Sequence, residues 1–305
     1  MTAEKTSHTV ALLGGDARQI GAAITLAGLG YHVCVWGVGG ERDYPPSVRF
    51  CPQWKEAIDS ADALLLPLPV SKDEIHLHTP CAQGGEELRL DVLFDHARGK
   101  LVLGGRFTDT QLKRAATQGI RCIDYFDCEI LQLKNALPTA EGAIEIAMRE
   151  LPVTVDGVHA AVIGYGRIGA LLSQKLLSLG AHVTVYARRQ ESLTLAELHQ
   201  CSTVLLGEGN EAAVLSHIGR DVRVIFNTVP VRLFSETVIS SLPARCVFID
   251  LASAPGGIDH GAAERMGVRC IWATALPGKY APETAGRMIA ETASLFLRGE
   301  ESSVP

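Results

Sequence analysis

The chain has 305 residues, which is enough for two domains of about 100–200 residues each. Its composition is 47% apolar, 20% charged and 6% aromatic, which is typical of a globular enzyme. The net charge of -6 argues against nucleic acid or an anionic membrane as the main partner. No apolar run approaches the roughly 20 residues of a membrane helix, and the first ten residues lack the apolar core of a signal peptide. We therefore expect a cytoplasmic protein that binds neither nucleic acid nor membrane.

The cysteines and histidines do not predict a metal site. None of the eight cysteines forms a C-x-x-C pair, and Cys34, Cys246 and Cys270 lie in apolar runs, where reduced and buried thiols are the usual state. His76 and His78 would share one face of a strand, but no third ligand is close to them in sequence. We expect no metal.

Short β-rich runs alternate with helical patterns along the first half of the chain. Their near-continuous apolar character is typical of parallel strands that are covered on both faces. A helix is expected at residues 108–118, with Thr108 or Asp109 as its N-cap and Gly119 as its C-cap. The predicted strands are residues 9–15, 32–37, 62–69, 100–105 and 121–125.

The second half repeats this alternation after a connecting segment. Residues 128–150 have a helical pattern that Pro138 interrupts, and residues 282–298 form a terminal helix that we expect to pack back across the domain junction. The predicted strands are residues 159–164, 182–187, 202–207, 223–230, 246–252 and 269–275, and the predicted helices are residues 167–179, 210–218, 235–241 and 259–266.

Alternation of strands and helices implies right-handed crossovers between parallel strands. The predicted fold class is α/β, with two doubly wound Rossmann-like domains and an interdomain cleft, a common place for a substrate. The first, substrate-binding domain would comprise residues 1–140 together with the returning helix at 282–300. The second, dinucleotide-binding domain would comprise residues 150–280.

A complete dinucleotide-binding fingerprint occurs at residues 161–170, which read AVIGYGRIGA. Gly164 permits the tight turn after the strand, Gly166 lets a pyrophosphate approach the backbone, and Gly169 brings the helix close to the strand. Because the motif follows an apolar strand and opens an amphipathic helix, it predicts a bound dinucleotide rather than a purely structural turn. The same cofactor site includes the intervening residues Tyr165, Arg167 and Ile168.

The strand at residues 182–187 is followed by Arg188 and Arg189, at the place where NAD enzymes hold the ribose 2′-hydroxyl with a carboxylate. Two guanidinium groups suit a 2′-phosphate. No acidic residue follows the strand before Glu191, so we expect no nearby carboxylate to repel that phosphate. The pattern favours NADP over NAD, and a pair of solvated arginines is the alternative.

A second glycine turn, LLGGDARQIG, lies at residues 12–21. Aligning the first glycines of the two turns puts Asp16 where Gly166 stands, and its side chain would crowd and repel a pyrophosphate. This turn therefore predicts no dinucleotide. Arg18 and Gln19 are suited to binding a substrate carboxylate instead. The alternative is a structural turn in which Asp16 caps the helix.

Ligands of doubly wound folds bind beyond the carboxyl ends of the strands. In the second domain two such ends, NTVP at 227–230 and DLASAPGG at 250–257, should lie along the nicotinamide and its ribose. Lys279 lies on a predicted loop, residues 275–286, and we expect it to be a catalytic residue at the cleft. The cofactor residues predicted at these ends are Asn227, Thr228, Val229, Pro230, Leu251 and Ala252.

Four further polar residues, Arg106, Asn135, Thr139 and Glu141, cluster around predicted turns that face the cleft. Cations there indicate an anionic substrate, which Arg18 and Arg106 would bind and which Asn135 and Thr139 would orient. Glu141 is a candidate general base. A charge at a helix N-terminus is the alternative interpretation of Glu141.

Seven motifs, in this order over nearly the whole chain, resemble the family formed by the A subunit of dipicolinate synthase from spore-forming bacteria: LLGGDARQ, LPLPVS, NALPTAEGAI, VIGYGRIG, FNTVP, DLASAPGGID and ALPGKYAPETAG. The second half is similar more broadly to alanine dehydrogenase and the 2-hydroxyacid dehydrogenases. The loop DLASAPGG lacks the arginine that 2-hydroxyacid dehydrogenases carry there, which counts against that class.

The resemblance implies an oxidoreductase that uses a nicotinamide cofactor to oxidise a dihydrodipicolinate, formed by loss of water from 4-hydroxy-tetrahydrodipicolinate, to pyridine-2,6-dicarboxylate. Its implied partner is the flavoprotein-like B subunit of dipicolinate synthase, and it further implies a role in spore formation and a place in the mother-cell cytoplasm. We also expect a homo-oligomer. Two alternatives stay open: another NADP-linked dehydrogenase of a small amino or hydroxy acid, and a non-catalytic dinucleotide-sensing subunit.

Overall fold

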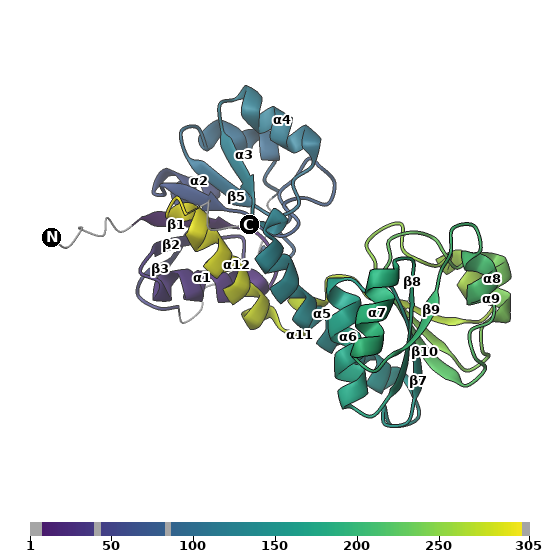
Figure 1. The fold of residues 1–305 in the computed structure, drawn as a ribbon. Helices are drawn as coiled ribbons and strands as arrows, with labels where there is room; N and C mark the ends of the chain where they lie inside the picture. Colours follow the sequence, from purple (N-terminus) through teal and green to yellow (C-terminus); the bar gives the residue numbers. More distant parts are fainter. Residues whose placement is uncertain (1–7, 40–43, 83–86, 301–305) are drawn as a thin grey trace. The chain divides into compact units, whose positions relative to one another are not determined.

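The structure, a computed structural model, describes residues 8–39, 44–82 and 87–300. The chain divides into two compact units, Met1–Asn135 with Pro277–Pro305, and Ala136–Leu276. Within the described residues each unit is built on one six-stranded sheet with helices on both faces (Figure 1). In the same residues no helix is both long and apolar enough to cross a membrane.

The sheet of the first unit is entirely parallel, with the strand order β3-β2-β1-β4-β5-β6. The chain starts in the middle of the sheet, winds outward to one edge, and returns to the middle at β4. The order therefore reverses between β1 and β4, which is where doubly wound sheets bind ligands. The strands are β1 Thr9–Leu13, β2 His32–Trp36, β3 Val48–Phe50, β4 Ala63–Leu65, β5 Leu101–Gly104 and β6 Arg121–Asp124.

Alternate strand residues of this sheet enter two separate cores. In β1, Val10 and Leu12 pack beneath α1 Arg18–Gly28 and α12 Pro282–Leu297, whereas Ala11 and Leu13 belong to the core on the opposite face. Both faces are buried, which explains why the strands read as continuous apolar runs. The opposite face is covered by α2 Trp54–Asp59, α3 Leu90–His96 and α4 Asp109–Thr117, and a short 3-10 turn, η2 Tyr125–Asp127, follows β6.

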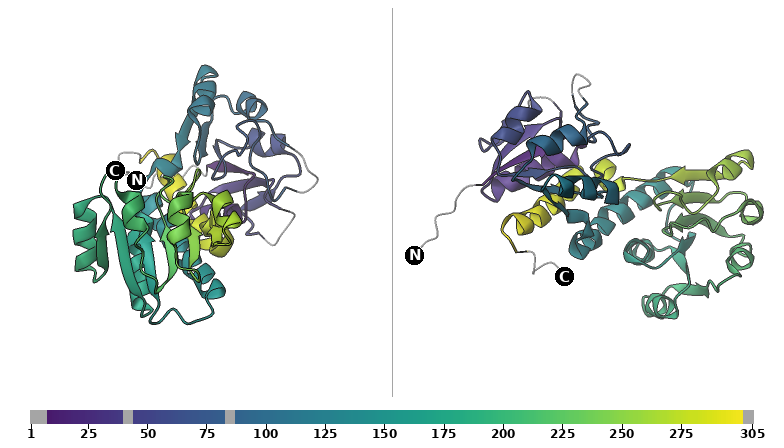
Figure 2. Two further views of the ribbon diagram at one scale, coloured as in Figure 1. Left: turned by 90° about the vertical axis from the view of Figure 1, so that its right-hand side faces the viewer. Right: turned by 90° about the horizontal axis from the view of Figure 1, so that it is seen from above.

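The terminal helix α12 returns to the first unit, as predicted, and packs there against α1. A Cβ atom on Gly286 of α12 would collide with the carbonyl oxygen of Arg18, and one on Gly21 of α1 would lie 3.0 Å from the carbonyl oxygen of Glu283. Glycine at both positions lets the two helix backbones approach closely. Figures 1 and 2 show the yellow α12 beside the purple elements of the first unit from three directions.

The second unit has the same topology, with the strand order β12-β11-β10-β7-β8-β9, again all parallel. The reversal of order lies between β7 and β10. Its strands are β7 His159–Ile163, β8 His182–Ala187, β9 Ser202–Leu205, β10 Val222–Asn227, β11 Val247–Asp250 and β12 Arg269–Trp272. Its helices are α6 Arg167–Ser178, α7 Gln190–Leu198, α8 Glu211–Leu215, α9 Glu236–Ser241 and α10 His260–Arg265, followed by α11 Leu276–Tyr280 at the limit of the unit.

The predicted interruption at Pro138 is wrong, because α5 runs without a break over Glu129–Glu150. Proline inside a helix removes one hydrogen bond to the residue four positions earlier, here the carbonyl of Lys134. The helix begins in the first unit, where Leu131 is buried, and ends in the second, where Ile146 and Ala147 are buried in the core. Core packing at both ends therefore outweighs the loss of one bond.

The predicted fold class, two doubly wound α/β units with a returning terminal helix, is confirmed. Thr108 is the N-cap of α4, in a capping box with Gln111, and Gly119 follows the C-cap residue Gln118. The edge strand β3 was not predicted, because three residues carry too little periodic pattern. Among the described residues no cluster of three or more His, Cys, Asp or Glu side chains is suited to a metal ion.

Candidate functional site

The glycine turn of the second unit joins β7 to α6. Gly164 has a φ of 93° and donates its N–H to the carbonyl of Tyr186 at 2.8 Å. A Cβ on Gly169 would collide with the carbonyl oxygen of Gly164, so the third glycine is required for the close approach of the helix. Beyond its chain neighbours and its own helix, no described atom lies within 4 Å of the place of a Cβ on Gly166, and no described side chain caps α6. The N-terminus of α6 is therefore open, which suits a pyrophosphate.

The loop after β10 lies beside this turn. Thr228 donates both its N–H and its hydroxyl to the carbonyl of Ile163, each at 2.9 Å, and a Cβ on Gly164 would crowd the Thr228 hydroxyl. The structure thus brings the first glycine and the predicted residue Thr228 together. The other predicted residues take the neighbouring places: Arg167 and Ile168 open α6, Val229 and Pro230 continue the loop after β10, and Leu251 and Ala252 follow β11.

Tyr165 connects the glycine turn to α7. Its side chain is buried, and its hydroxyl lies 2.9 Å from Nδ1 of His199, which also lies 3.1 Å from Nε2 of Gln174. Burial raises the pKa of Tyr165 to about 12, so the phenol is neutral at physiological pH. The hydroxyl thus fixes the turn in place through its contact with His199. Tyr165 can contact a dinucleotide through its backbone.

Two exposed arginines follow the end of β8. Arg188 Nε lies 3.6 Å from Oε1 of Glu211 at the start of α8. The expectation that no acid is near these arginines is therefore wrong. Glu211 is 23 positions away in sequence, but the β9 connection returns it to the end of β8. Arg189 is the N-cap residue of α7 and has no ion-pair partner among the described residues.

A buried carboxylate holds together the two loops that we predicted along the nicotinamide. Asp250 ends β11, is fully buried, and accepts hydrogen bonds from Asn227 Nδ2 at 2.8 Å and from the N–H groups of Gly257 at 2.8 Å and Ala252 at 3.2 Å. Asn227 is fully buried too, and its Nδ2 also donates to the carbonyl of Val229 at 3.0 Å. These bonds fix the relative positions of the loops after β10 and β11.

His260 and Trp272 complete the cluster around Asp250. His260 Nε2 lies 3.3 Å from Asp250 Oδ2, and its ring stacks on Trp272 with centroids 4.8 Å apart. The indole Nε1 donates to the carbonyl of Ala252 at 2.9 Å. None of these three side chains was predicted from the sequence. A usable signal was the single charge, Asp250, inside the apolar run 246–252, because a carboxylate buried in a strand requires donors.

The glycine turn of the first unit begins like the other turn but closes differently. Gly14 donates its N–H to the carbonyl of Trp36 at 2.8 Å, the same bond that Gly164 makes. Gly15 then donates to the carbonyl of His78 at 2.8 Å, so that residues 77–79 pack over the turn. The helix α1 starts one residue later after its strand than α6 does. Counted from the strand, Asp16 therefore takes the place of Gly166. Counted from the helix it lies one position earlier, because Gly166 is the N-cap of α6 and Asp16 precedes Ala17, the N-cap of α1.

Asp16 and Arg18 form an ion pair at this turn. Asp16 Oδ1 accepts from the N–H of Arg18 at 3.1 Å and from its Nε at 2.8 Å, and Oδ2 accepts from Nη2 at 2.8 Å. Nη2 of Arg18 also donates to the carbonyl of Leu68. The Arg18 side chain is 8% exposed and that of Asp16 27%. Gln19 is buried beside them, and its amide has no hydrogen-bond partner within the described residues.

Burial by itself raises the pKa of Asp16, but the hydrogen bonds and the charge of Arg18 outweigh burial and hold the pKa below its ordinary value of 3.8. The stabilising contribution of this carboxylate is therefore complete above about pH 4, and it is lost as the pH falls through the lower folded value. We expect Asp16→Asn to lower the free energy of unfolding at pH 7 by about 3 kcal/mol, because it leaves a buried guanidinium without its anion. Urea denaturation measures this. The double variant Asp16→Asn/Arg18→Met should lose less than Asp16→Asn alone, and a single variant as stable as the native chain would contradict the argument.

The other predicted substrate and catalytic residues lie mostly in helices. Arg106 follows β5 with a φ of 59°, is exposed, and holds its guanidinium 5.2 Å from the centroid of Phe126. Asn135 and Thr139 lie inside α5, so their predicted placement at turns is wrong, because the helix continues through Pro138. Lys279 is exposed in the short helix α11, not on the predicted loop.

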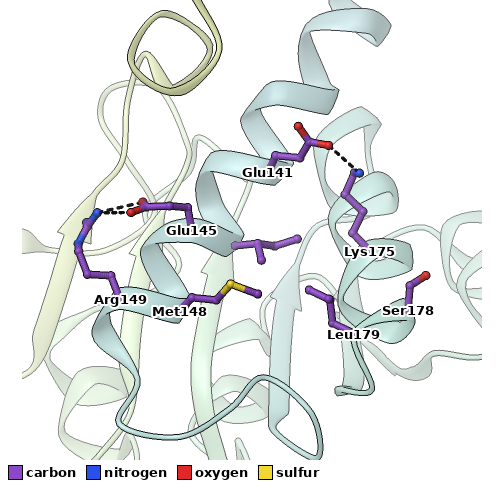
Figure 3. A pocket seen from close by; sticks show the side chains of 8 residues that line it. Glu141, Glu145, Met148, Arg149, Lys175, Ser178 and Leu179 are labelled. Carbon is purple, nitrogen blue, oxygen red and sulfur yellow. Dashed lines mark hydrogen bonds and ion pairs between the residues drawn. The ribbon is translucent and has the colours of Figure 1, made fainter.

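Glu141 also lies inside α5, and its carboxylate is paired. Its Oε1 lies 2.9 Å from Nζ of Lys175 on α6, with side chains 55% and 34% exposed. Figure 3 shows the pair at one end of a surface hollow of about 670 Å³ between the two helices. The remaining lining residues are Ile144, Glu145, Met148, Arg149, Ser178 and Leu179. The predicted turn at Glu141 is wrong, whereas its role as a base stays a prediction.

Comparisons with known proteins agree with the motifs. Residues 9–126 match the model of the N-terminal domain of the dipicolinate synthase A subunit. The chain is 29% identical over 294 residues to the A subunit of dipicolinate synthase from Bacillus subtilis (strain 168), covering 96% of each chain. The crystal structure of the A subunit of dipicolinate synthase from Bacillus halodurans superposes with a TM-score of 0.83 at 27% identity, covering 95% of this chain and 97% of the other.

A solved L-alanine dehydrogenase has a TM-score of 0.65 at 14% identity, covering 94% of this chain and 88% of the other. At this identity the likeness shows the fold, which is one that dehydrogenases use. The resemblance read from the seven motifs is therefore confirmed. The chain resembles the A subunit of dipicolinate synthase over nearly all of its length, and residues 9–126 match the model of that subunit's N-terminal domain.

Proposed function

We propose that the chain is an NADP-dependent oxidoreductase, the dehydrogenase subunit of a dipicolinate synthase. The observation that carries the proposal is the open N-terminus of α6, where Gly166 leaves space against the backbone and no described side chain caps the helix. The N–H groups in the first turn of any helix have no acceptor within the helix, and a pyrophosphate is suited to that place. The sequence identity of 27–29% to A subunits of dipicolinate synthase, over nearly the whole chain, supports a dihydrodipicolinate as the substrate.

The proposed reaction converts a dihydrodipicolinate and NADP⁺ to pyridine-2,6-dicarboxylate, NADPH and one proton. The nicotinamide, when bound, accepts the hydride. The buried bonds of Asp250 would hold the loops after β10 and β11 in place for that ring. The ring proton that leaves on aromatisation needs a base, and Glu141 is our candidate, with Asn135 and Thr139 orienting the substrate.

The substrate carries two carboxylates, which require cations or several N–H donors when they leave water. Arg106 and Lys279 are exposed and have no ion-pair partner within the described residues, so we propose that they bind a carboxylate. Arg18 is already occupied by Asp16. Its proposed role in substrate binding therefore requires that a carboxylate of the substrate and that of Asp16 bind the same guanidinium group.

The proposed partner is the B subunit of a dipicolinate synthase, as the name of the relatives implies. The decisive experiment follows NADPH formation at 340 nm with the chain alone, with its proposed partner, and with candidate substrates. NADPH formation from dihydrodipicolinate supports the proposal. Formation only from a small amino or hydroxy acid would show a different dehydrogenase. Binding of dinucleotide without turnover under all conditions would show a sensing subunit.

Cofactor choice gives a separate prediction. NADP should bind more tightly than NAD, and Arg188→Ala/Arg189→Ala should remove most of that preference, at about 1.5–3 kcal/mol for each charged hydrogen bond lost. Because Glu211 competes with the phosphate for Arg188, Glu211→Gln should strengthen NADP binding and leave NAD binding nearly unchanged. Calorimetry with both dinucleotides measures this. Equal affinity of the native chain for NADP and NAD would refute the assignment.

A further inference from the structure

A basic cavity lies at the amino end of the sheet in the second unit. Its volume is about 890 Å³, and it is bounded by the segment that joins α8 to β10 and the segment that joins α9 to β11. Strands of a parallel sheet begin at this end, whereas the glycine turn follows the carboxyl end of β7. The cavity is therefore separate from the proposed dinucleotide site.

The charged side chains that line this cavity are all basic: Arg220, Arg223, Arg245 and, when protonated, His217. No carboxylate is among its lining residues, although acidic residues outnumber basic ones in the chain, 34 to 28. None of the three arginines has an ion-pair partner within the described residues. Arg220 and Arg223 also line an adjoining hollow together with two acids, Asp156 and Asp221, and Oδ2 of Asp221 lies 3.3 Å from Nδ1 of His159.

Arg223 provides a second, independent observation. Its Nε is buried and has no hydrogen-bond partner in the described part of the chain. A buried guanidinium N–H without an acceptor costs free energy, and native structures rarely leave one unpaired. A molecule in the cavity can supply the missing acceptor. An anion supplies both the acceptor and the opposite charge.

The helix ends at this cavity do not cancel its charge. The C-cap residues of α8 and α9, Ser216 and Leu242, line the cavity, and the end of a helix carries at most about half a negative charge. Two such ends offset about one of the three arginines. The hydroxyls of the serines that line the cavity already donate to carbonyls of these two helices. Among the residues that line the cavity itself, an excess of about two positive charges is left for a ligand.

We propose that this cavity is a second ligand site, for a small anion with two or more negative charges, such as a phosphate ester or a dicarboxylate. The planar guanidinium group binds both phosphate and carboxylate through paired hydrogen bonds. The volume lies within the usual range for small-molecule sites, about 300–1,000 Å³, so there is room for the body of the ligand besides its charged group.

The test measures binding of inorganic phosphate and of pyridine-2,6-dicarboxylate to the full chain by calorimetry, with sodium chloride at matched ionic strength. The Gly166→Asp variant serves as the background, because it blocks anion binding at the glycine turn. We expect at least one of the two probes to bind to the Gly166→Asp variant. Adding Arg223→Gln to that variant should weaken the binding of this probe about tenfold. Arg220→Gln/Arg245→Gln should weaken it further, and the probe that binds tighter identifies the ligand class.

The matched control is Arg265→Gln, which removes the same charge from α10 of the same unit, where Arg265 pairs loosely with Glu236 at 3.9 Å. It should leave binding unchanged. If Arg265→Gln weakens binding of the probe as much as Arg223→Gln does, the binding reflects general attraction to positive charge, and the proposal is overturned. Binding unaffected by Arg223→Gln, or no binding of either probe, would overturn it too. Because the proposed dehydrogenase activity is not part of this measurement, its failure and that of the second site are distinguishable.

Discussion

A Gly166→Asp chain should fold normally and bind NADP at least about 10³-fold more weakly than the native chain. The new carboxylate would lie beside the pyrophosphate, where two like charges 4 Å apart repel by about 4 kcal/mol at an effective dielectric constant of 20. The fold should tolerate the change, because Gly166 has a φ of -88° and its Cβ position is open among the described residues. Calorimetry measures the affinity, and thermal unfolding checks the fold.

Two controls separate charge from shape in this experiment. Gly166→Ala adds only a methyl group and should weaken binding much less than Asp does. Gly28→Asp adds the same charge at the end of α1 in the first unit, at another position whose Cβ site is open among the described residues and whose φ is not positive, and should leave binding intact. If Gly166→Asp binds NADP as tightly as the native chain, the dinucleotide is not held at this turn. Two dinucleotides per native chain would show that the turn at residues 12–21 binds one as well.

Glu141→Gln should lower turnover by about 10²–10⁴-fold if Glu141 is the general base, with a smaller effect on KM. The amide keeps the size of the side chain but cannot accept the ring proton. A stopped-flow or steady-state assay of NADPH formation measures the effect, in the presence of the proposed partner subunit. Glu141→Asp should restore part of the rate, because the shorter side chain keeps the carboxylate.

The competing role for Glu141 is the ion pair with Lys175, which a Lys175→Met variant tests. A pair of side chains this exposed contributes at most about 1 kcal/mol to stability. If Glu141 only serves the pair, then both variants cause the same small loss of stability and neither changes turnover. A drop in turnover with Glu141→Gln but not with Lys175→Met identifies the base.

Much of this architecture is determined by local sequence. Each strand that was predicted from an apolar run exists. The reason is clearest for the central strands, because a strand buried on both faces must be apolar along its length. The motif GYGRIG defines the turn at Gly164 because its three glycines meet steric limits within a short stretch of chain: the positive φ of Gly164, the open position of Gly166 and the close contact of Gly169. Short-range sterics of this kind need no knowledge of the rest of the fold.

Other features depend on contacts that only the tertiary structure decides. Proline at position 138 locally predicts a break, yet α5 continues because both of its ends are buried in cores. Glu211 approaches Arg188 across 23 residues, and Asp250 binds Asn227 across 23 residues, because parallel strands bring their carboxyl ends to one edge. The basic cavity that Arg223 lines is formed by two segments of the chain, one after α8 and one after α9. Periodicity reports which face of an element is buried, but it does not report which side chains of distant elements meet there. Pairing of charges and closure of cavities are therefore set by topology, whereas strands, helices and the glycine turn are set by the residues themselves.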